Sequence, residues 1–139
     1  MHIDHEALDE QGYVVLPRLL DASTCRTLIA DYADPRLFRS RIVMARHNFG
    51  RGEYQYFDYP LPRTVKRLLE TLFEALGPIA NAWAARMGIS TRYPKTLKAY
   101  LSRCHRAGQE RPTPLMLKYG PDDYNCLHQD LYGDAHFPL

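Results

Sequence analysis

The sequence predicts an α+β fold in a single domain over residues 1–139. Helical periodicity fills much of the middle of the chain, whereas extended apolar runs separated by turn residues gather near its end. No repeat, low-complexity tract or linker divides the two parts. Because helices and strands are segregated along the chain, we expect a mostly helical part over 1–112 and the first core strands over 113–139.

The composition limits the class of protein. Apolar residues make up 45% and charged residues 24% of the 139 positions, which is typical of one globular domain and excludes disordered or fibrous classes. No apolar run approaches the roughly 18 residues of a membrane span, so no membrane association is expected. A net charge of +2 does not by itself indicate a nucleic-acid partner. Three cysteines without paired spacing, after a polar and acidic start, favour reduced thiols in the cytoplasm.

The first sixty residues are expected to hold one helix and two short strands. The helix is indicated by apolar residues at i, i+3, i+4 and i+7, and it should end near Asp34 because the residue before a proline avoids helical angles. Its apolar positions are Cys25, Leu28, Ile29 and Tyr32. The strands are expected over 12–16 and 41–45, and an aromatic, glycine-bearing loop over 48–60.

Three further helices are expected before the chain changes character. The clearest begins at Pro62, carries apolar residues spaced 3, 4, 7, 8 and 11 positions from the first, and should break at Gly77-Pro78. A second continues to Gly88, and a third runs from about Pro94 to Arg106. Strands and turns should follow, with extended runs over 114–119, 124–130 and 136–139 and turns over 120–123 and 133–134.

One short motif carries possible chemistry. In an extended chain, residues two apart point to the same face, so His128 and Asp130 should aim an imidazole and a carboxylate at one point. Two histidines and one carboxylate form the facial triad that binds non-haem Fe(II), and this pair would supply two of the three ligands. The spacing alone is common, and it also fits an ordinary surface pair beside a turn.

The surrounding residues resemble a known superfamily. Residues 117–130, LKYGPDDYNCLHQD, resemble the stretch before the metal motif of 2-oxoglutarate- and Fe(II)-dependent dioxygenases, and residues 9–21, DEQGYVVLPRLLD, resemble their opening strand and helix. Runs such as HQDLYG and FPL are similar to an uncharacterised bacterial branch of these oxygenases. The resemblance implies the N-terminal portion of a double-stranded β-helix, or jelly roll, that is incomplete here.

The resemblance also implies cofactors and site residues. His128 and Asp130 would be iron ligands, and Tyr119 would match a tyrosine that often hydrogen-bonds the 2-oxoglutarate carboxylate, although it could equally be a tyrosine of the sheet core. The implied reaction is a hydroxylation coupled to oxidative decarboxylation of 2-oxoglutarate. The substrate is open, and the aromatic loop over 48–60 is where we would look for specificity.

Two features of that family lie beyond this chain. Its second histidine ligand and the basic anchor for 2-oxoglutarate come downstream of the position of Leu139, and none of the other histidines is a good substitute. We therefore expect an isolated chain with impaired activity. Half a jelly roll would also leave open sheet edges, which invite self-association.

Three alternatives from other classes stay open. The first is a catalytically inactive fragment or pseudo-enzyme with a binding or structural role. The second is a zinc site, since Cys126 alternates with His128 and Asp130, although Cys126 also fits a small core residue, as do Cys25 and Cys104. The third, which the low net charge disfavours, is nucleic-acid binding by basic clusters; these are Arg36, Arg39, Arg41 and Arg46, and Lys95, Lys98, Arg103, Arg106 and Arg111.

Overall fold

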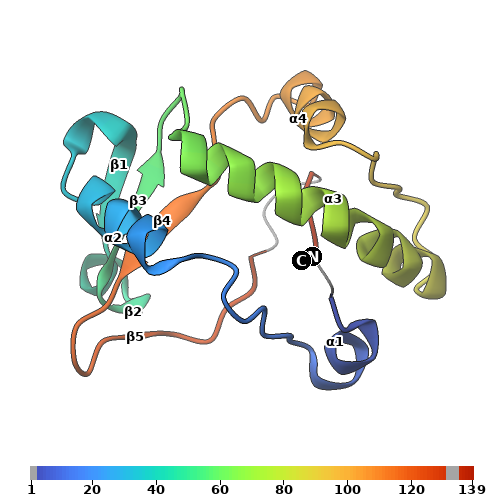
Figure 1. Cartoon of the computed structure of the whole chain (residues 1–139), viewed down its shortest axis with the longest axis horizontal. Helices are drawn as coiled ribbons and strands as arrows, with labels where there is room; N and C mark the ends of the chain where they lie inside the picture. Colours follow the sequence, from blue (N-terminus) through green and yellow to red (C-terminus); the bar gives the residue numbers. More distant parts are fainter. Residues whose placement is uncertain (1–2, 131–134) are drawn as a thin grey trace.

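The computed structural model describes residues 3–130 and 135–139 and combines four α-helices with two small antiparallel sheets within those residues (Figure 1). This confirms the α+β class but does not establish the jelly roll. The helices are α1 (His5–Gln11), α2 (Ala22–Asp31), α3 (Arg63–Arg86) and α4 (Leu97–Arg106), with short 3-10 turns η1 (Pro35–Leu37) and η2 (Met44–His47). The strands are β1 (Phe38–Val43), β2 (Gly50–Arg51), β3 (Glu53–Phe57), β4 (Leu115–Lys118) and β5 (Tyr124–Asn125).

The strands come from both halves of the chain, so the predicted segregation is incomplete. One sheet has the order β1-β3-β4, in which Ile42 lies opposite Tyr54 and Tyr54 lies opposite Leu117. The second pairs β2 with β5. The prediction of a loop over 48–60 is therefore wrong for 50–51 and for 53–57, where aromatic residues suit the central position between two strands.

Helix α3 corrects a second prediction, because it runs without a break through Gly77 and Pro78. A proline inside a helix costs about 3 kcal/mol, since it removes one backbone hydrogen bond and crowds the preceding turn. Buried residues on both sides of the proline, Phe73 before it and Ile79 and Ala80 after it, favour one continuous helix. Pro78 itself is exposed, on the side where water can reach the backbone.

Three more predictions differ from the structure. Residues 12–16 form no strand, because Val14 and Leu16 pack against a hydrophobic cluster instead of a neighbouring strand. The apolar stripe of α2 is not buried: Ile29 is 71% exposed and Cys25 is exposed, so Cys25 is not a core residue. Residues 126–130 and 135–139 are not strands, and the turn expected at 133–134 lies outside the described residues.

The core lies along α3 in two clusters. One contains Ile3, Leu8 and Ile79, with Leu139 packed against it, so both ends of the described chain contribute to the same cluster. The other contains Phe73, Tyr100 and Cys104 and connects α3 to α4; the ring of Phe137 lies 5.0 Å from that of Phe73. Within the described residues, no helix combines the length and the apolar character that a bilayer span requires.

An ion pair attaches α1 to α3 and should make stability depend on pH. The Arg86 guanidinium donates hydrogen bonds of 2.7 and 2.8 Å to the Asp9 carboxylate, and the Trp83 indole donates another. These bonds, chiefly those from Arg86, lower the pKa of Asp9 from 3.8 to about 2. Since the folded pKa is depressed, the stabilisation is present above the unfolded pKa and is lost as pH falls through the folded one.

We therefore expect Asp9→Asn to lower the melting temperature at pH 6 and to have little effect near pH 2. Thermal unfolding followed by circular dichroism across this range measures the difference from the wild type. Glu10→Gln, on the same helix and exposed, is the control and should show no such pH dependence. If Asp9→Asn lowered the melting temperature as much at pH 2 as at pH 6, the ion-pair explanation would be contradicted.

Candidate metal centre

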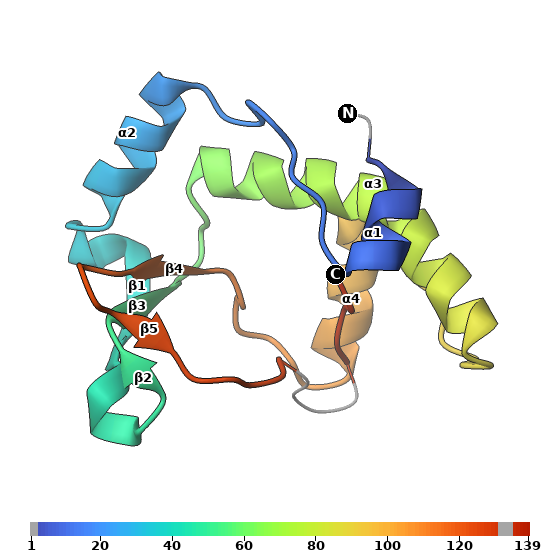
Figure 2. The same ribbon diagram turned by 90° about the horizontal axis from the view of Figure 1, so that it is seen from below.

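The segment that carries the predicted ligands is attached to the β2 region by backbone hydrogen bonds. Gly50 pairs with Asn125 and Arg51 with Tyr124, and the Cys126 N–H donates a 2.7 Å bond to the Phe49 carbonyl. Figure 2 shows β2 and β5 side by side, with the chain leaving β5 toward the C-terminal part. The position of residues 126–128 therefore depends on residues more than seventy positions earlier.

His128 and Asp130 converge. The Nε2 atom of His128 lies 3.5 Å from Oδ1 of Asp130, which is close enough for both groups to bind one ion. The Nδ1 atom lies 2.7 Å from the Cys126 carbonyl oxygen, which only accepts hydrogen bonds. Nδ1 therefore carries the proton in the neutral ring, and Nε2 presents a free lone pair toward Asp130.

The convergence has a different origin from the one predicted. Residues 128–130 are not in a strand, so strand alternation does not bring the side chains together. The Nδ1 contact with the backbone fixes the imidazole instead. The pair is open to solvent, with 45% of the His128 side chain and 81% of the Asp130 side chain exposed.

No third ligand joins the pair within residues 3–130 and 135–139, where no group of three histidine, cysteine or acidic side chains could hold a metal. The Cys126 thiol lies 3.8 Å from the Asn48 carbonyl, which argues against the zinc alternative. His47 stacks on Phe49, and His105 and His136 are exposed. His5 is an exposed residue of α1, and His2 lies outside the described residues.

Tyr119 follows β4, and its ring covers Gly52 between β2 and β3. A Cβ atom on Gly52 would lie 2.9 Å from the Tyr119 ring, so the ring and the glycine backbone are in close contact. Tyr119 is 44% exposed. No hydrogen bond joins it to His128 or Asp130 in the part of the chain that the structure describes, so its role toward 2-oxoglutarate stays a prediction.

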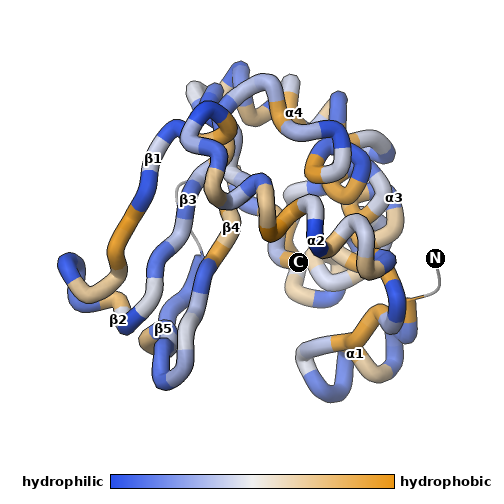
Figure 3. Tube along the Cα trace, turned by 60° about the vertical axis from the view of Figure 1, so that its left-hand side comes forward, coloured by the Kyte–Doolittle hydropathy of each residue, from blue (hydrophilic) through white to orange (hydrophobic). Residues whose placement is uncertain are grey.

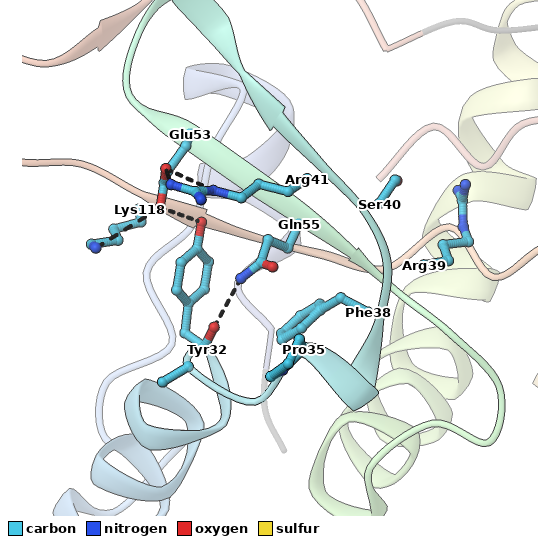
Figure 4. A pocket seen from close by; sticks show the side chains of 10 residues that line it. Tyr32, Pro35, Phe38, Arg39, Ser40, Arg41, Glu53, Gln55 and Lys118 are labelled. Atoms are coloured by element: carbon cyan, nitrogen blue, oxygen red, sulfur yellow. Dashed lines mark hydrogen bonds and ion pairs between the residues drawn. The ribbon is translucent and has the colours of Figure 1, made fainter.

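Sequence reasoning missed a charged network on the sheet. The Glu53 carboxylate accepts hydrogen bonds from Arg41 Nε at 3.0 Å and from the Tyr32 hydroxyl at 3.2 Å, and Lys118 lies 3.8 Å away (Figure 4). Arg41, more than the other neighbours, lowers the pKa of Glu53, whereas burial and then the Glu53 charge raise the pKa of Tyr32. Strand alternation of Glu53 with Gln55 could have indicated this network if 53–57 had been predicted as a strand.

The network borders an open depression of about 550 Å³, lined by Tyr32, Ala33, Pro35, Phe38, Arg39, Ser40, Arg41, Glu53, Gln55 and Lys118. Its cations already have partners: Arg41 and Lys118 face Glu53, and Arg39 donates to the Pro112 carbonyl. Arg36 outside it is paired with Asp34. Three of the four arginines in the first basic cluster are therefore engaged within the fold.

Gly50 is expected to be essential for the position of the site. Its φ of +132° is unfavourable for L side chains, and a Cβ atom there would lie 2.2 Å from the Tyr124 carbonyl oxygen. Gly50→Ala should therefore separate β2 from β5 and weaken metal binding by about 10-fold or more. Metal titration and amide hydrogen exchange of 124–126 measure both effects.

Gly88→Ala is the matched control, because Gly88 also has a positive φ of +69° but has open space around its Cβ position. It should cost some stability and leave metal affinity unchanged. Equal losses of metal affinity in the two variants would show that general destabilisation, rather than the β2–β5 contact, accounts for the effect.

Comparisons with known proteins give one family and two relatives. The Oxygenase-NA family model, described as "Oxygenase, catalysing oxidative methylation of damaged DNA", matches residues 52–139. Two curated proteins of Mycobacterium tuberculosis, MT2286 of strain CDC 1551 / Oshkosh and Rv2227 of strain ATCC 25618 / H37Rv, are both named uncharacterized. Each is 51% identical over 89 residues, which are 64% of this chain and 38% of the relative. No solved structure matches.

Proposed function

Because the chain belongs to the Oxygenase-NA family of oxygenases, we propose that it takes part in a ferrous-iron and 2-oxoglutarate-dependent oxygenation, with His128 and Asp130 as metal ligands. The observation that carries the proposal is the 3.5 Å separation of His128 Nε2 and Asp130 Oδ1. The family match supports the oxygenase class, and the geometry of the two donor atoms supports His128 and Asp130 as the metal ligands. The chain spans 38% of the length of the relatives it matches, so the activity of a whole protein is part of the proposal.

The donor set fits the proposed ion. A neutral imidazole nitrogen and an ionised carboxylate are two of the three protein ligands in the facial sites that bind non-haem Fe(II). A bound ferrous iron would supply the redox chemistry that couples oxidation of 2-oxoglutarate to oxygenation of a substrate. The protein's own part is to fix the orientation and tautomer of the imidazole through the contact of Nδ1 with the Cys126 carbonyl, so that Nε2 faces the ion, and to keep Asp130 beside it.

Tyr119 is proposed to orient the co-substrate. Its contact with Gly52 holds the ring near the β2–β5 region, where the segment carrying His128 is also attached. The phenol is a hydrogen-bond donor that suits one carboxylate of 2-oxoglutarate. Ferrous iron and three free cysteines suit the reducing conditions of the cytoplasm.

Activity is proposed to be impaired in this chain. The described residues supply two ligands in place of three, so metal affinity should be lower than in a complete facial site. The same observation supports the second candidate function, a catalytically inactive protein that binds a partner or has a structural role. The two candidates differ in whether turnover accompanies metal binding.

Damaged DNA is the substrate class that we propose, and the description of the family supports it. This differs from the sequence analysis, in which the low net charge disfavoured a nucleic-acid partner. Net charge is a property of the whole chain, whereas a local surface decides binding to a short stretch of nucleic acid.

The test uses the purified chain, Fe(II), 2-oxoglutarate, ascorbate and single-stranded DNA with methylated bases, and it measures succinate and bound metal. Succinate formation that His128→Ala abolishes is the result expected of an impaired oxygenase. Metal binding without succinate would support the inactive candidate. Equal succinate from the wild type and a folded His128→Ala variant, or no metal binding at all, would overturn the assignment of the ligands.

A further inference from the structure

An exposed group of rings and cations lies beside the metal pair, on β2, on β5 and on the turn before β2. Phe49 is 49% exposed and Tyr124 56% exposed, and the side chain of Arg51 is 60% exposed. The ring of His47 stacks on that of Phe49 with centroids 5.5 Å apart and planes at 22°. We call Arg46, His47, Phe49, Arg51 and Tyr124 the β2 surface.

The β2 surface is connected directly to the candidate metal centre. Arg51 and Tyr124 are opposite each other in the β2–β5 pair, so their side chains share a face. Cys126 donates its N–H to the Phe49 carbonyl, and its own carbonyl contacts His128 Nδ1. Cys126 therefore links the backbone of Phe49 to the imidazole of His128 through its N–H and its carbonyl group.

The cations of this surface are less engaged than the others nearby. Arg46 has no ion pair in the part of the chain that the structure describes. Arg51 forms a long ion pair with Asp123, in which nitrogen and oxygen are 3.7 Å apart. By contrast, Arg36 and Arg41 are held by closer ion pairs with Asp34 and Glu53. Arg46 and Arg51 can therefore turn to an external anion at little cost.

Figure 3 shows the sequence pattern behind this arrangement. The hydrophobic end of β1 leads to the fully buried Met44, and the chain then becomes hydrophilic in the turn before β2. Met44 anchors the turn, and its N–H donates to the Gly52 carbonyl at 3.0 Å. The backbone that carries the β2 surface is therefore held in place by Met44, although the side chains of the surface are exposed to solvent.

We propose that the β2 surface binds single-stranded DNA and places a base beside His128 and Asp130. Aromatic rings stack on bases whatever their sequence, and arginines contact the phosphate backbone. Duplex DNA hides the faces of its bases, so the rings indicate a single strand. The inference rests on the proposed function for its substrate class, but the binding itself needs neither iron nor 2-oxoglutarate.

Binding is tested by fluorescence anisotropy of a labelled single strand of about 12 nucleotides in the presence of EDTA. Phe49→Leu keeps an apolar side chain without the ring and should weaken binding by about 10-fold. The double variant Arg46→Gln, Arg51→Gln should lower the slope of log affinity against log salt by about 1.4, since each single-strand phosphate contact contributes about 0.7.

Two variants away from the β2 surface serve as controls. Tyr13→Leu removes a ring that is 62% exposed near α1, and Arg26→Gln removes an exposed cation on α2, which Figure 2 shows at the other end of the strand region from β2. Both should bind like the wild type. Absence of binding, equal affinity for duplex and single strands, or equal effects of the surface and control variants would each overturn the inference.

The outcome can be separated from that of the proposed function. Metal titration without DNA tests His128 and Asp130, whereas the EDTA experiment tests the β2 surface alone. DNA binding without metal binding would support the β2 surface as a DNA-binding site and contradict the assignment of His128 and Asp130 as metal ligands. The opposite result is metal-dependent succinate formation together with Phe49 and arginine variants that bind DNA like the wild type. It would support the metal ligands and contradict DNA binding by the β2 surface.

Discussion

Replacing His128 with alanine is expected to lower the affinity for Fe(II), or for Co(II) as a spectroscopic substitute, by about 100-fold or more. Loss of a residue that only supports a ligand already costs about 10- to 100-fold, and His128 supplies one of the two ligands proposed here. Asp130→Asn keeps the shape of the side chain but removes its negative charge, so it should also reduce affinity. Anaerobic titration followed by absorbance measures the dissociation constants.

Two controls make this prediction specific. Cys126→Ala removes a thiol that lies 3.8 Å from the Asn48 carbonyl but retains the backbone carbonyl that contacts His128 Nδ1. His105→Ala removes an exposed histidine on α4. Both should bind metal like the wild type, and a large loss in Cys126→Ala would instead favour a thiolate site such as zinc.

Phe57→Ala is expected to reduce the free energy of unfolding by about 3–5 kcal/mol. Phe57 is 1% exposed, and its ring stacks on that of Phe38 with centroids 4.7 Å apart. Its N–H also donates to the Pro114 carbonyl at 3.0 Å, where β3 approaches β4. Because domains of this size are stable by only about 5–15 kcal/mol, part of the population should unfold at 37 °C.

Urea denaturation measures the loss, and Phe49→Ala is the matched control because it removes the same ring from an exposed position. It should change the free energy of unfolding by about 0.5 kcal/mol or less. Similar losses in the two variants would show that the buried ring of Phe57 is not a main source of stability.

The elements predicted correctly are those whose signal is local. Strand β4 and helix α4 lie within the predicted ranges, and Cys104 is buried, as expected of a small core residue. The continuous α3 was missed because burial on both sides of Pro78 outweighs a local signal for a break. Cys25 was misplaced because a helical apolar stripe says nothing about whether another element covers it.

The candidate site was predicted in part. The sequence pattern led to the His-x-Asp pair, and the two side chains do converge, although a backbone contact of His128 rather than a strand brings this about. The Glu53 network was not predicted, and the β2 surface was predicted only through the aromatic loop over 48–60 and Arg46, because each needs pairings between residues from about 12 to more than 70 positions apart. The narrower bacterial branch, the jelly roll and the self-association through sheet edges stay predictions.

The meeting of Ile3 and Leu139 in one cluster has a consequence for engineering. A flexible peptide linker could join the two ends, which would make a head-to-tail cyclised backbone. Such a ring would have fewer unfolded conformations to lose on folding, so cyclisation should stabilise the native state. New termini could then be opened in an exposed loop such as the one after α3, which would leave both the β2–β5 pair and the histidine–aspartate pair uncut.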